Sequence, residues 1–158
     1  RRLPQHHAGD AMTYTVAEVI TAISASFLAL SSTPDWRANT TPYDLLPGTP
    51  DAWEHRSFSI AAPQTAWGGN ESSRVQRTAG LVHTTIGVRW MFRIRGDAVS
   101  ADYLLALTAE AELIRALTTI TGVPMRIVLD SETRVYAADG SRILGQINLT
   151  VAHHHPVG

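Results

Sequence analysis

The chain has 158 residues, of which 44% are hydrophobic and 17% charged, and its formal net charge is −1. These values predict one globular domain, large enough to bury roughly 68–70% of its unfolded surface. The chain contains no cysteine, which excludes thiol nucleophiles, disulfide bonds and cysteine-dependent zinc sites. All 13 Lys and Arg residues are arginines, which also excludes a P-loop lysine and Schiff-base chemistry.

The arginines are unevenly distributed. A GC-rich coding sequence accounts for the absence of lysine, and selection for planar guanidinium groups is the alternative explanation. Neither explains why the stretch from Ser72 to Gly96 carries +5 without a single acid, while the rest of the chain carries −6. The five arginines of this stretch are Arg74, Arg77, Arg89, Arg93 and Arg95.

The N-terminal residues have no hydrophobic period. We therefore expect a disordered or non-native extension over residues 1–11, followed by a single domain over residues 12–158. No window approaches ~18 consecutive apolar residues, so we expect no membrane span and synthesis in the cytoplasm.

A helix is predicted first. Thr15 and Glu18 have the spacing of a capping box, and apolar residues then recur at helical spacing, which predicts a helix over residues 16–30. From there to about Arg56 the chain contains four prolines, too many for a regular element. We expect an ordered loop there, anchored by Trp36, Tyr43 and Trp53.

Two strands follow in the pattern. Residues 57–62 alternate as in a strand that ends at Pro63, and Gln64 to Gly80 is predicted to be a long loop. From Val82 to Ile94 every second residue is apolar or β-branched, which predicts a long antiparallel strand with one buried face and one basic face. At ~3.3 Å per residue this strand is long for a small sheet, so it bends at Gly87 or projects beyond the core.

A second helix is predicted between Ser100, the expected N-cap, and the stop signals Gly122 and Pro124. It is apolar around most of its circumference, so it must bury more than one side. We expect the second side to form a subunit interface through Leu105, Leu113, Ala116 and Ile120.

Two further strands complete the pattern. The first covers Met125 to Leu129, and residues 133–136 extend or reverse it. Asp139-Gly140 predicts a turn into a last strand over Ser141 to His153. The elements predict an α+β fold, in which an antiparallel sheet of about four strands carries two helices on one face.

Candidate chemistry is sparse. His153 and His155 fall on one face of the last strand and could share a metal ion, but a frayed or partly exposed strand end explains the three histidines better. The chain has neither a G-x-S-x-G nor an H-E-x-x-H motif. We interpret the acids Asp97, Asp102, Glu110 and Glu112 as solvated or interface residues, because their helical phases scatter.

The acid-free basic stretch has two interpretations. A solvated sheet face is the usual explanation of such a pattern. A surface that faces a polyanion is the alternative, and the absence of acids favours it because solvated faces mix charges. On this interpretation Arg74, Arg77, Arg89, Arg93 and Arg95 line an electrostatic surface rather than read a base sequence.

With its elements in order, the chain from Met12 onward resembles the tail terminator proteins of long-tailed bacteriophages, the family of the lambda minor tail protein U. The resemblance rests on the early amphipathic helix, the proline-rich loop, the strand Thr84 to Arg95 with Gly96-Asp97-Ala98 and a helix after it, and the closing strand Leu144 to His153. These are patterns of length and order, which related neck proteins share.

The resemblance implies a non-enzymatic virion protein at the head-tail junction. It implies a ring, usually of six subunits, that caps the tail tube, joins it to the head connector and lets genomic DNA pass through its lumen. The partners implied are further copies of the chain, the tail tube protein and the head-completion protein, with no cofactor. Another neck or tail-completion protein, a small metal-dependent hydrolase and a nonspecific nucleic-acid-binding module are the alternatives.

Overall fold

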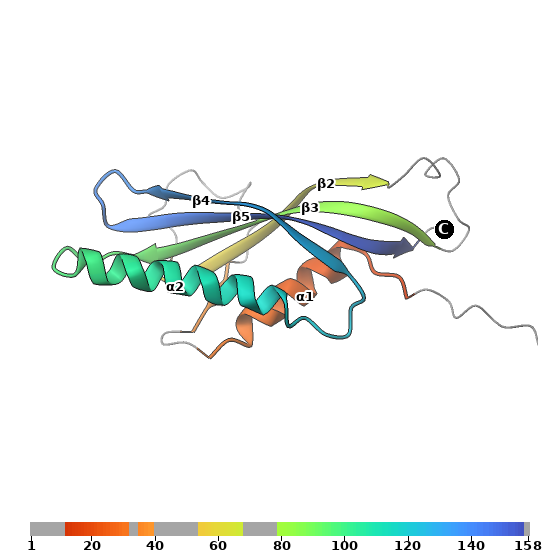
Figure 1. The fold of residues 1–158 in the computed structure, drawn as a ribbon, viewed down its shortest axis with the longest axis horizontal. Coiled ribbons are helices and arrows are strands. Elements are labelled where there is room, and N and C mark those ends of the chain that lie inside the picture. Colours follow the sequence, from red (N-terminus) through yellow and green to blue (C-terminus); the bar gives the residue numbers. More distant parts are fainter. Residues whose placement is uncertain (1–11, 32–34, 40–53, 68–78, 157–158) are drawn as a thin grey trace, which may run out of the picture.

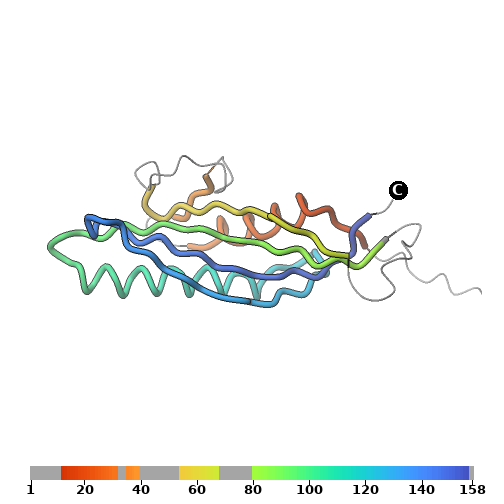
Figure 2. The backbone as a smooth tube through the Cα atoms, turned by 90° about the horizontal axis from the view of Figure 1, so that it is seen from above, coloured from red at the N-terminus to blue at the C-terminus, as the bar shows by residue number. Residues whose placement is uncertain are grey.

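A computed structural model describes residues 12–31, 35–39, 54–67 and 79–156. They form an α+β fold with two helices on one face of a five-stranded sheet, in the strand order β1-β2-β3-β5-β4 (Figure 1). Seen from above, α1 underlies the β2 side of the sheet and α2 the β4 side (Figure 2). The predicted fold class is confirmed. The elements are α1 (Val16–Leu28), β1 (Arg37–Ala38), β2 (Ser57–Trp67), β3 (Ala79–Arg93), α2 (Val99–Leu117), β4 (Arg126–Tyr136) and β5 (Arg142–Pro156).

The start of α1 is the predicted capping box. The Glu18 N–H donates to Thr15 Oγ1 at 3.2 Å, and the Thr15 N–H donates to Glu18 Oε2 at 2.7 Å. The helix ends at Leu28, two residues before the predicted end, and buries Val19, Ile23 and Phe27 against the sheet. The predicted extension over residues 1–11 lies outside the described residues.

The loop after α1 is described only in part. Trp36 is buried, as expected of an anchor, whereas Tyr43 and Trp53 lie outside the described residues. Beside Trp36, β1 adds a fifth strand that the sequence did not predict, parallel to the start of β2. A strand of two residues is too short to leave a periodic signal.

The strand β2 continues past Pro63 to Trp67, so the predictions of a strand end at Pro63 and of a loop from Gln64 are wrong. A register shift between Ala61 and Gln64 accounts for the difference. Proline has no N–H to donate, and a bulge needs none at that position, so the strand bends there and continues. The rest of the predicted loop, residues 68–78, lies outside the described residues.

The long strand β3 is predicted correctly on its buried face. It pairs with β5 from Ala79 to Arg93 without a register shift, so the ladder neither breaks at Gly87 nor leaves β3 projecting alone. Its opposite face is less basic than expected, because Gly87 and Met91 are buried between the charged positions. The buried helix-facing residues are Val82, Thr84, Ile86, Val88, Trp90 and Phe92.

The predicted N-cap and end of α2 are wrong. Its N-cap is Ala98, two residues before Ser100, and no side chain caps the helix. At the other end the hydroxyls of Thr118 and Thr119 donate to helix carbonyls at 2.7 and 2.9 Å, which satisfies the last turn and ends the helix before Gly122.

The last two strands form a hairpin around the predicted Asp139-Gly140 turn, where Gly140 has a φ of 73°. Residues 133–136 extend β4 rather than reverse it, after a register shift between Leu129 and Ser131. The strand β5 remains paired as far as Pro156, and the Tyr14 N–H donates to the His154 carbonyl at 2.7 Å. The end of β5 is therefore not frayed, but it is the partly exposed strand end that was the other part of the prediction, because His154 is exposed and His155 half-buried while His153 is buried.

The centre of the core is a close contact between Trp90 and the backbone of β5. Trp90 is fully buried, and Gly145 lies opposite it in the β3–β5 ladder. A Cβ atom at Gly145 would lie 2.0 Å from Cε2 of the indole ring. Only glycine lets the ring lie flat on the neighbouring strand at this position.

Replacing Gly145 by alanine tests this contact. We expect G145A to lower the free energy of unfolding by about 3 kcal/mol. The added methyl group would overlap the buried indole of Trp90, so the ring or the strand would have to shift within a closely packed core. Gly96→Ala is the control, since an added Cβ there meets nothing within 4 Å. Urea unfolding followed by Trp fluorescence measures both, and equal effects would contradict the proposed role of Gly145.

Candidate functional site

The predicted arginine surface is only partly present in the described residues. Arg74 and Arg77 lie outside them. Arg89 is half-buried on the sheet face away from the helices and has a contact of its own, and Arg93 is exposed at the end of β3. Arg95 lies beyond the strand, so its prediction as a residue of the strand face is wrong.

Arg95 is engaged with Asp102 in the first turn of α2. Its backbone N–H and Nε–H donate to Asp102 Oδ2 at 2.8 and 2.9 Å, and its Nη2–H donates to Oδ1 at 2.8 Å. These hydrogen bonds lower the pKa of Asp102 from its ordinary 3.8 to about 2. The pair fastens the end of β3 to the start of α2.

The predicted interface residues of α2 do not lie together. Leu113 and Ala116 are buried in the core of the chain itself, so their prediction as interface residues is wrong. Ile120 is partly buried and packs against the same core. Leu105 is 48% exposed, and it lines a pocket beside His55.

The apolar surface left exposed is one that the sequence did not single out. We define the α2–β4 edge as four exposed apolar residues: Leu104, on the side of α2 turned away from the sheet, and Leu129, Val135 and Tyr136 of β4, of which Val135 lies on the sheet face away from α2. Its two elements are in contact, because Tyr103 of α2 stacks on Tyr136 with ring centroids 6.1 Å apart. The strand β4 is also the last strand of the sheet, so its outer backbone edge is unpaired among the described residues.

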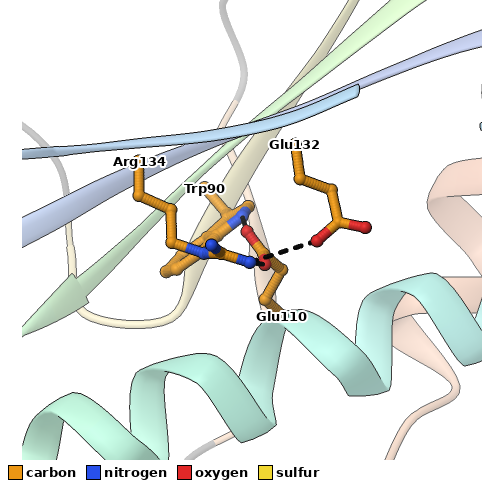
Figure 3. Close-up of polar contacts among 4 residues, drawn as sticks. All are labelled: Trp90, Glu110, Glu132 and Arg134. Carbon is orange, nitrogen blue, oxygen red and sulfur yellow. Dashed lines mark hydrogen bonds and ion pairs between the residues drawn. The ribbon is translucent and has the colours of Figure 1, made fainter. Parts of the chain in front are cut away.

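Beneath β4, a buried carboxylate ties α2 to the sheet. Glu110 is 1% exposed, and its Oε2 accepts the Trp90 indole N–H at 3.1 Å. Its Oε1 accepts the Nε–H of Arg134 at 2.9 Å and a second N–H from Nη2 of the same residue. Figure 3 shows Glu110 rising from α2 between Trp90 and Arg134, with Glu132 beside the guanidinium.

Glu110 and Asp102 were interpreted from the sequence as solvated or interface acids, and both interpretations are wrong. Each is buried and each is satisfied by an arginine. Burial raises the pKa of Glu110 above its ordinary value, while the hydrogen bond from Arg134 opposes the rise. The arginine partners come from outside α2, so no spacing within the helix reveals them.

The C-terminal histidines form a structural network. Nδ1–H of His153 donates to the Tyr14 carbonyl at 3.0 Å, which leaves Nε2 to accept the Thr84 hydroxyl at 3.0 Å. His155 lies on the same face, with ring centroids 6.3 Å apart, whereas His154 is exposed. The described residues contain no group of three or more His, Cys, Asp or Glu side chains that could hold a metal ion.

No protein-family model matches the chain, and no curated protein matches it in sequence. Within the described part of the chain, neither helix is long and apolar enough to cross a membrane.

Acid titration tests the Arg95–Asp102 pair. Because the pKa of Asp102 is lowered on folding, its contribution to stability is complete above 3.8 and is lost as the pH falls toward 2. We expect D102N to be less stable than the wild type at pH 6, and this difference to shrink between pH 4 and 2. Urea unfolding at several pH values measures it, with Asp97→Asn as the control for removing an exposed acid nearby. A difference that does not change with pH would count against the pair.

Replacing Glu110 and Glu132 separately tests how much the buried carboxylate contributes to stability, because both glutamates contact Arg134. E110Q should lower the free energy of unfolding by about 2–4 kcal/mol, since it leaves the indole and guanidinium beside an uncharged group. E132Q removes the exposed partner, 3.1 Å from the same guanidinium, and should cost less than about 1 kcal/mol. Thermal unfolding of both variants measures the contrast, and equal losses would show that burial does not distinguish the two carboxylates.

Proposed function

We propose that the protein is a structural subunit of a phage tail terminator ring. The subunit caps the tail tube, joins it to the head-completion protein and surrounds a lumen through which DNA passes. It acts by assembly and carries out no reaction. Six copies per ring is the number that the resemblance implies.

The observation that carries this proposal is the α2–β4 edge. Leu104 and Val135 are each 63% exposed, and Tyr136 is 54% exposed. The apolar residues of β4 lie beside an unpaired strand edge, which is typical of surfaces that pair with another chain, and Leu104 adds an exposed apolar side chain on the outer side of α2. A ring supplies such a partner for every subunit, whereas an isolated enzyme has no use for the surface.

The elements on which the resemblance rests support the proposal as well. The early capped helix, the long strand, the helix that follows it and the closing strand are all present in this order. The residues at the end of β3, Arg89 and Arg93, provide a limited basic surface for the DNA backbone.

The alternatives receive less support. Another neck or tail-completion protein would use the same surfaces, and the position of the chain in an imaged particle distinguishes it from a terminator. A metal-dependent hydrolase needs ligands that the described residues do not bring together. A nonspecific DNA-binding module needs a continuous basic face, and Arg95 is already engaged by Asp102.

Ring formation is the test. We expect electron microscopy of the purified protein or of the particle to show rings, and light scattering to give the corresponding mass. L104E and V135E should each weaken subunit association at least about tenfold, because each puts a charge into an apolar contact. Leu28→Glu is the matched control, since Leu28 is exposed on α1 away from the edge. A chain that is monomeric both free and in the particle would overturn the proposal.

A further inference from the structure

A second surface, at the opposite side of α2 from β4, is a small pocket rich in hydrogen-bond donors. It encloses about 400 Å³ where β2 begins, β3 ends and α2 starts. Leu105 closes the α2 side of the pocket. The charged and aromatic residues that line it are His55, Arg56, Phe92, Arg93, Arg95 and Asp102.

Arg56 is the unusual residue of this pocket. Its side chain is 10% exposed, and its guanidinium lies 5.4 Å from the ring centroid of Phe92 and 5.8 Å from that of Trp36. Buried charges in proteins are normally paired and fully hydrogen-bonded. Here Nε has no hydrogen-bond partner among the described residues, and the one ion pair, to Glu112, is long at 3.5 Å.

The backbone of Arg56 is also strained. Its φ is 55°, and it is the one residue other than glycine with a positive φ in the described part of the chain. Its N–H donates to the Met91 carbonyl at 3.0 Å, and its own carbonyl accepts the Arg37 N–H at 2.9 Å, so two strands hold it in this conformation. Strain of this kind collects at functional sites, where the surrounding structure fixes a side chain in place.

Among the residues that line the pocket, the neighbours of Arg56 add donors rather than free acceptors, and the carboxylate of Glu112 lies outside this lining. His55 Nδ1 accepts the Arg93 N–H at 3.0 Å, which leaves Nε2 as the N–H donor of the neutral ring. The one lining carboxylate, Asp102, already accepts three hydrogen bonds from Arg95. Its acceptor capacity is therefore largely used within the pocket wall.

We infer that this pocket binds a phosphate group between Arg56 and Arg93. Guanidinium groups suit phosphate because their N–H donors match its oxygens in a planar, charge-assisted geometry. A tetrahedral anion accepts hydrogen bonds from several directions, and these arginines and the His55 ring supply donors around the pocket. A carboxylate, in contrast, is satisfied by the two parallel N–H groups of one guanidinium. The inference stands whether or not the chain forms a ring.

Binding of inorganic phosphate to the purified chain tests the inference. At constant ionic strength, with chloride as the balancing anion, we expect one saturable site by calorimetry or ³¹P NMR. R93Q should weaken it about tenfold, as expected for the loss of a charge-assisted hydrogen bond. Arg93 is exposed, so R93Q should fold even if R56Q, expected to abolish binding, does not.

Arg115→Gln is the matched control, because Arg115 is an exposed arginine on α2 outside the pocket. The inference is overturned if the folded chain shows no saturable binding, or if R93Q and R115Q weaken binding equally. A competing DNA duplex then identifies the source of the group. Displacement of phosphate by the duplex indicates a nucleic-acid backbone, and retention of phosphate indicates a small phosphorylated ligand.

Discussion

The contact of Trp90 with Gly145 and Glu110 is the constraint on which the rest of the fold depends. The indole ring covers the glycine of β5, and its N–H reaches a carboxylate of α2 that also binds Arg134 of β4. Three strands and a helix therefore meet at one side chain. A buried ion pair adds little net stability by itself, because desolvation opposes the Coulomb attraction. Its effect is to fix which turn of α2 lies under which residues of the sheet.

This fixed position decides which apolar residues of α2 remain outside. Once Glu110 faces the sheet, the residues one helical turn away on the same side, Ala106 and Leu113, are buried with it. Leu104 then points away from the sheet, and β4 is held beside α2 by the contacts of Arg134 with Glu110 and of Tyr136 with Tyr103. The exposure of these apolar residues on α2 and β4 is thus a consequence of how the core is packed.

Local patterns predicted the elements well, and non-local contacts explain the failures. The capping box of α1, the alternation in β3 and the Asp139-Gly140 turn are signals carried by neighbouring residues, and each was correct. The helix α2 is apolar around most of its circumference, so its sequence does not show which side faces the sheet. Leu113 was therefore assigned outward and Leu104 was not singled out. The partners of Asp102 and Glu110 come from other elements, and periodicity within one helix carries no information about them.

The arginine distribution shows the same difference between sequence and space. Five arginines without an acid form a basic stretch when counted along the chain. In the fold, however, α2 places the carboxylate of Asp102 against Arg95, which neutralises part of this charge. Charge that remains near Arg93 is concentrated at one end of the sheet rather than spread along β3. The electrostatic part of DNA affinity grows with the number of phosphates contacted, because each contact releases counterions. A short basic patch therefore holds DNA weakly, as the proposed lumen requires if a genome is to slide through it, while a buried donor such as Arg56 suits one phosphate held in place.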